Sequence, residues 1–291
     1  MEAIVVGGLL LLLGGLAAVR IVFYGGLWVV VQLYPGVTMN DVMVSLQMGS
    51  GEHVSELLVA NAIAQAVGLG GVAWLAAAWR PEGLAWMRLH AASPRSMAVA
   101  CVGLLGLMPA MQVLGAVNTA LLPESLRAYD AAQHTLFASL LSGEGASALV
   151  RALVFLALTP ALFEEIFFRG ALLHTWEARG RTWGLVASSV AFSAFHMRPG
   201  QVVPLLLIGL YLAFVVQRTG SVRPAIAAHA LYNAALIVLA TMNAQGGQVP
   251  EPGVLSVGSG LGLAIGAMVW LRRHVPSPPQ ILPTDAGVHV P

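Results

Sequence analysis

The stretch AIVVGGLLLLLGGLAAV, residues 3–19, contains no charged side chain, and apolar sequence continues beyond Arg20 as far as Tyr34. A helix of about 20 mostly apolar residues spans the hydrocarbon core of a bilayer. A cleaved secretory signal begins with a basic leader, whereas the run here is preceded by the acidic Glu2. We therefore predict an uncleaved membrane helix at the start of the chain.

Apolar segments of similar length recur to the other end of the chain. Hydrophobic residues make up 58% of the sequence and charged residues 9%, whereas a soluble domain carries about 25% charged residues. No basic patch with interleaved aromatic residues occurs, so we exclude nucleic acid as a partner. The expected fold is all-α, a polytopic membrane bundle of about eight helices. We place these helices at residues 3–33, 57–79, 97–121, 149–172, 183–198, 202–217, 224–243 and 254–271.

The basic residues of the short loops predict an orientation, because arginines gather on the cytoplasmic side of a membrane. One side of the predicted bundle would hold Arg80, Arg88, Arg95, Arg179, Arg181, Arg218, Arg223, Arg272 and Arg273. Both termini are then expected in the cytoplasm. All basic residues are arginines and none is lysine, a bias typical of GC-rich bacterial genomes, so we expect an integral protein of a bacterial inner membrane.

Three clusters of polar residues lie inside the predicted spans: FEEIFFRG at 163–170, FSAFH at 192–196 and HALYN at 229–233. An ionisable group in a membrane helix is costly unless it is paired or faces a wet cavity, so each cluster is a candidate functional site. Taken singly, each cluster also fits an interhelical ion pair or a core hydrogen bond. Together they favour one functional site, because the cost of desolvation would otherwise recur for structure alone.

The spacing within the clusters assigns different tasks to their members. Adjacent carboxylates point about 100° apart around a helix. Glu165 and Arg169 stand four residues apart with the acid first, which favours a helical ion pair and leaves Glu164 for chemistry. His229 and Asn233 share one helix face and offer two hydrogen-bond donors, as an oxyanion site requires. His196, from another helix, would take a proton from water beside the Glu164 carboxylate.

In this order, Glu164-Glu165-x-x-x-Arg169, Phe192-x-x-x-His196 and His229-x-x-x-Asn233 resemble the three motifs of the CAAX-protease and bacteriocin-processing (CPBP/ABI) membrane proteins. This family includes the type II CAAX prenyl endopeptidases. The resemblance implies an intramembrane peptidase in which Glu164 and His196 activate a water and His229 and Asn233 stabilise the oxyanion. It implies supporting roles for Glu165, Arg169 and Phe192, with Phe192 lining the site.

Four regions follow from these assignments. They are membrane helices with an interfacial amphipathic helix at 1–148, a catalytic core at 149–245, a last membrane helix at 246–274 and a disordered Pro-rich tail at 275–291. In the last helix Gly258, Gly262 and Gly266 recur every four residues, a spacing that predicts close approach by another helix.

Two alternatives remain open at this stage. Glu164, His196 and His229 would also supply three zinc ligands, making the protein a metallopeptidase instead of a cofactor-free glutamate peptidase. A non-catalytic immunity, scaffold or transport protein would use the same buried groups without hydrolysis. As substrate we expect a membrane-tethered or apolar protein or peptide, cut near its terminus, such as a prenylated C-terminus, a sorting signal or a leader peptide. The sequence does not predict an oligomeric state.

Overall fold

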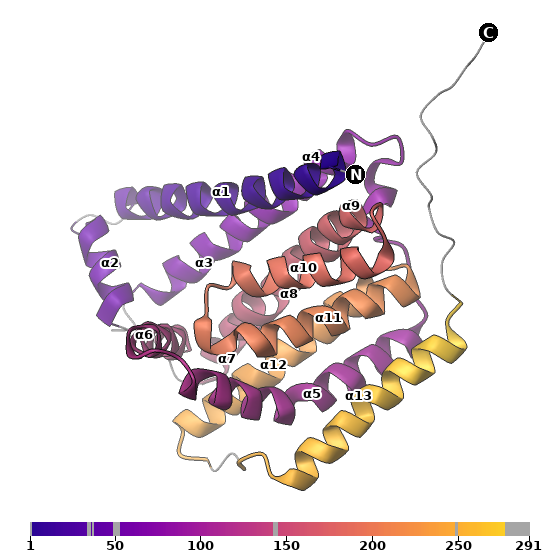
Figure 1. Cartoon of the computed structure of the whole chain (residues 1–291). Coiled ribbons are helices and arrows are strands. Elements are labelled where there is room, and N and C mark those ends of the chain that lie inside the picture. The colour runs from indigo at the N-terminus through magenta and orange to yellow at the C-terminus, as the bar shows by residue number, and fades with distance from the viewer. Residues whose placement is uncertain are drawn as a thin grey trace.

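The computed structural model describes residues 2–33, 36, 38–48, 53–141, 145–247 and 250–276, and every regular element in these ranges is a helix (Figure 1). This confirms the predicted all-α membrane bundle. The N-terminal half contains α1 (Glu2–Leu33), α2 (Met39–Met48), α3 (Val54–Ala64), η1 (Gln65–Gly70), α4 (Gly71–Ala78), η2 (Gly83–Met87), α5 (Pro94–Ala120) and α6 (Glu124–Leu140). The predicted tail, apart from Val275 and Pro276, lies outside the described residues.

The C-terminal half carries the three polar clusters. It contains α7 (Gly145–Ala152), η3 (Leu153–Leu158), α8 (Thr159–Glu165), η4 (Ile166–Leu172), α9 (Leu173–Glu177), α10 (Arg181–Phe195), η5 (Pro199–Gln201), α11 (Val202–Thr219), α12 (Arg223–Ala244) and α13 (Val254–His274). In Figure 1, α1 and α3 form one flank and α5 and α13 the other, with α8, α10, α11 and α12 between them.

Within the described ranges, seven helices are long and apolar enough to cross a membrane, where the sequence predicted about eight. The difference is the segment predicted at 183–198. Its helix, α10, has 15 residues, which at 1.5 Å per residue extends only about 22 Å, less than a hydrocarbon core of about 30 Å. The chain turns back after His196 and returns as α11, which packs along α10.

The arginine-bearing loops meet at one end of the bundle, as the sequence predicts. The side chain of Arg88 pairs with Glu177, and that of Arg223 donates to the carbonyl oxygen of Leu89. Arg218 donates to the carbonyl oxygen of Arg272 at 2.8 Å, joining the end of α11 to the end of α13. These loops are therefore on one side of the membrane; that this side is cytoplasmic stays a prediction.

Glycine allows α13 to approach α5 closely, but not at the predicted positions. A Cβ atom added at Gly260 would collide with the carbonyl oxygen of Gly106. A Cβ atom added at Gly258, Gly262 or Gly266 would have no neighbour within 4 Å among the described residues. These three glycines therefore do not make the predicted contact within the chain, because the face of α13 that meets α5 carries Gly260 instead.

Candidate active site

The first polar cluster lies in one continuous helical segment, Gly145–Glu177. The wider π-helical turns of η3 and η4 flank the short α8, at whose start Pro160 lies. Proline lacks the N–H that an α-helix needs for its i−4 hydrogen bond. The missing hydrogen bond at Pro160 therefore comes directly after the π-helical turns of η3. Interruptions of this kind occur often at functional sites because they change the direction of the following side chains. Here the following side chains include Glu164 and Glu165.

Glu164 is a buried carboxylate beside His196. The residue is only 4% exposed, and its Oε2 atom makes no hydrogen bond to any described residue. His196 Nε2 lies 3.7 Å from that same oxygen. This distance is too long for a hydrogen bond between the two atoms. Each atom is therefore able to form a hydrogen bond with a third group that lies beside both.

The tautomer of His196 follows from its other nitrogen. Nδ1 lies 2.8 Å from the carbonyl oxygen of Phe192, which is one turn earlier in α10. A carbonyl oxygen only accepts hydrogen bonds, so Nδ1 carries a proton. In the singly protonated ring Nε2 is then an acceptor, and it faces the Glu164 carboxylate.

Glu164 and His196 lie at similar depth. At 1.5 Å per residue, Glu164 is about 20 Å from the end of α9 and His196 about 22 Å from the start of α10. The helix that carries Glu164 was predicted to end at residue 172, but it continues to Glu177. This extra length places Glu164 as deep as His196.

The second carboxylate, Glu165, joins two other cluster members. Its Oε1 accepts from Arg169 Nη1 at 2.8 Å, so the predicted ion pair is present, and both side chains are fully buried. His229 Nδ1 lies 2.8 Å from the same oxygen. A carboxylate oxygen accepts hydrogen bonds, so His229 donates to it through Nδ1–H. The link from His229 to Glu165 was not predicted.

Phe192 lies at the centre of the cluster. Its ring centroid is 4.6 Å from that of His196 and 5.8 Å from that of His229, and the Arg169 guanidinium lies 4.2 Å above its face. The ring is fully buried, as a residue lining the site would be. Asn233 lies one turn after His229 on α12 and is half-buried.

The three residues predicted as zinc ligands come from two parts of the cluster. Glu164 and His196 face each other, whereas His229 directs Nδ1 to Glu165. This bond leaves Nε2 of His229 open, as in metal sites where a histidine donates its other N–H to a carboxylate. Within the described residues no group of three or more His, Cys, Asp or Glu side chains is placed to hold a metal ion, and the zinc alternative stays a prediction.

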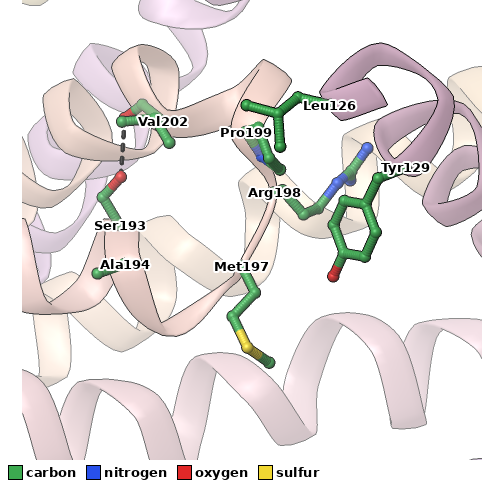
Figure 2. Close-up of a pocket in the computed structure, with 8 residues that line it drawn as sticks. All are labelled: Leu126, Tyr129, Ser193, Ala194, Met197, Arg198, Pro199 and Val202. Atoms are coloured by element: carbon green, nitrogen blue, oxygen red, sulfur yellow. Dashed lines mark hydrogen bonds between the residues drawn. The ribbon is translucent and has the colours of Figure 1, made fainter. Parts of the chain in front are cut away.

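Two apolar grooves border the cluster without including its charged members. One, of about 400 Å³, lies between α6 and the turn that follows His196 (Figure 2). It is lined by Leu126, Tyr129, Ser193, Ala194, Met197, Arg198, Pro199 and Val202. The other, of about 440 Å³, lies where Val154 and Leu158 face Ala230 and Ala234 of α12.

The burial of one acidic residue beside the site was not predicted. Asp130 lies on α6, the amphipathic helix expected before the catalytic core, and is 1% exposed. Its Oδ1 accepts a hydrogen bond from the backbone N–H of Gly200, in the turn after His196. No sequence pattern indicates this contact, because the two residues are 70 positions apart.

Comparison with known families identifies the segment that carries the site. Residues 146–235 match the family described as type II CAAX prenyl endopeptidase Rce1-like. All of the residues singled out from the three motifs, from Glu164 to Asn233, fall within this match, whereas α1 to α6 lie outside it. No curated protein and no solved structure matches the chain. The predicted family resemblance is confirmed, and with the seven apolar helices it indicates a CAAX-type intramembrane protease.

Proposed function

We propose, from the premise that residues 146–235 match the type II CAAX prenyl endopeptidases, that the protein is an intramembrane endopeptidase of the glutamate type. It cuts a membrane-tethered or apolar peptide near its terminus by means of a water held between Glu164 and His196. The observation that carries the proposal is the buried Glu164 Oε2, which makes no hydrogen bond to a described residue, lying 3.7 Å from Nε2 of the partly exposed His196.

A single water satisfies both acceptors. It donates one hydrogen to the Glu164 carboxylate and the other to His196 Nε2, at ordinary distances of about 2.8 Å. Both hydrogens are then occupied, and an oxygen lone pair is directed away from the two side chains toward a peptide carbonyl. As the oxygen attacks, one proton passes to Glu164 or His196, which later returns it to the leaving amine.

His229 and Asn233 are proposed to stabilise the tetrahedral oxyanion. Because Nδ1–H of His229 donates to Glu165, Nε2 is the nitrogen that remains for substrate, and it donates only when the ring is doubly protonated. Asn233 supplies a neutral second donor from the next turn. Loss of one such donor typically slows catalysis about 10²–10³-fold.

The pairing of Glu164 with a single imidazole supports a cofactor-free mechanism. A non-catalytic transport protein would use the same buried groups as a proton relay, and the mapping of peptide termini distinguishes that role from a peptidase.

The proposal is tested by mapping peptide termini in membranes. Membrane proteins from cells that express the wild-type chain are compared by mass spectrometry with those from cells that express Glu164→Gln, at equal protein levels. Glu124→Gln, an exposed acid on α6, is the matched control. We expect new termini in the wild-type and control samples that are missing with Glu164→Gln. Identical termini in all three samples would remove the support for a protease.

A further inference from the structure

The turn after His196 has a conformation that needs support. Met197 adopts φ 49, in the left-handed region that non-glycine residues rarely occupy. Backbone of this kind persists where surrounding contacts hold it, and such residues cluster at functional sites. Since Met197 directly follows His196, whatever fixes this turn also fixes the backbone that carries the imidazole.

Several contacts to the turn come from helices outside the matched segment. Asn118, near the end of α5, donates to the carbonyl oxygen of Pro199 at 2.6 Å. On α6, Asp130 Oδ1 accepts from the N–H of Gly200 at 3.2 Å, and His134 lies 3.0 Å from a nitrogen of Arg198. Figure 2 shows the Arg198 side chain extending toward α6.

Asp130 is the central group among these contacts. One carboxylate oxygen bonds the turn, and the other, buried and without a hydrogen bond among the described residues, lies 3.5 Å from His134 Nε2. A Cβ atom added at Gly200 would collide with this carboxylate and with the hydroxyl of Thr119. Gly200 therefore allows the backbone to approach Asp130 closely, and a hydrogen bond to a carboxylate is stronger than one to a neutral acceptor.

We propose that Asp130 is a positioning residue for His196: through Gly200 it clamps the turn at residues 197–201 and so holds Nε2 at the distance from Glu164 that a shared water requires. This inference rests on the proposed peptidase function and extends the site to α6, beyond the family match. On this view α6 forms one wall of the groove in Figure 2 and at the same time supports the catalytic histidine.

The kinetic test uses the full chain in lipid nanodiscs with a peptide substrate identified by terminus mapping. Asp130→Ala removes the acceptor, Asp130→Asn retains an oxygen for Gly200, and Glu124→Ala removes an exposed carboxylate from the same helix. We expect Asp130→Ala to lower kcat about 10–100-fold, as small displacements of catalytic groups do, with KM changed less than about twofold. Asp130→Asn should recover most of the rate and Glu124→Ala all of it. A purely structural role would instead reduce the amount of folded protein at unchanged kcat.

A second measurement does not depend on cleavage. Hydrogen exchange of the Gly200 amide should be about tenfold faster in Asp130→Ala than in wild type, and close to wild type in Asp130→Asn. Gly200→Ala serves if Asp130→Ala does not fold, because its Cβ displaces the carboxylate. Unchanged exchange in Asp130→Ala, or faster exchange with unchanged kcat, overturns the proposal. A wild-type chain that cleaves nothing contradicts the peptidase function, while the exchange experiment still decides whether Asp130 holds the turn.

Discussion

Substitutions in the fully buried ion pair of Glu165 and Arg169 should change the free energy of unfolding and the rate of cleavage independently. Both side chains are 0% exposed, with 2.8 Å between Oε1 and Nη1. Removing one partner of such a pair leaves an uncompensated buried charge and typically costs about 3–5 kcal/mol. For Glu165→Gln we expect the lower value, about 3 kcal/mol, because glutamine retains an acceptor and Glu164 is adjacent in the helix.

Removing the second charge should restore much of this loss. Arg169→Met replaces the guanidinium with an apolar chain against Phe192, and the double variant has no unpaired charge at this position. We expect the two substitutions to couple by about 2 kcal/mol, within the range seen for contacting residues. Activity should not recover, because His229 in the double variant still lacks the carboxylate beside Nδ1.

The assay is equilibrium unfolding in mixed micelles for the two single variants and the double variant, with peptide cleavage measured on the same samples. Glu251→Gln, an exposed acid, is the control. Two results would refute the reasoning: a Glu165→Gln variant as stable as wild type, or a double variant in which stability and cleavage recover together.

Three further predictions concern packing, pH and metal. Gly260→Ala should destabilise the bundle by about 1–3 kcal/mol through its clash with Gly106, whereas Gly258→Ala, with open space around it, should unfold like wild type in the same assay. Partial burial, and after it the charge of Arg198, lowers the pKa of His134 from its usual 6.5; the folded state then binds fewer protons than the unfolded state, so stability should fall below about pH 6.5. The fall measured between pH 7.5 and pH 5.5 should be smaller in His134→Gln, and an equal fall would contradict the assignment. Cleavage by metal-stripped protein in the presence of chelator should equal that of untreated protein, and loss of cleavage that added zinc restores would contradict the cofactor-free mechanism.

Local spacing was sufficient to predict part of this structure. The apolar runs predicted the membrane helices, and the four-residue separation of Glu165 and Arg169 predicted their ion pair. Both features depend on one helix and on the geometry common to all helices. Features that depend on a single element are therefore accessible from the sequence.

Contacts between distant elements were not accessible in this way. His229 and Glu165 are 64 positions apart, and spacing along α12 does not indicate that Nδ1 faces Glu165. Asp130 belongs to α6, a polar helix that is not a membrane span. Its side chain is covered by the turn that contains Gly200, which is 70 positions away in the sequence. The glycines of α13 also could not be told apart from the sequence, because which of them contacts α5 depends on where α5 lies; the contact is made by Gly260.

The most direct test of the central claim, that Glu164 and His196 activate one buried water, is the kcat of purified Glu164→Gln on a mapped peptide substrate. Glutamine keeps the size of the side chain but is not a base. The account predicts a fall of at least about 10²–10⁴-fold, with KM and the unfolding midpoint close to wild type. A Glu164→Gln protein that retains more than about a tenth of the wild-type kcat, where loss of a general base predicts at least 10²-fold, would contradict it.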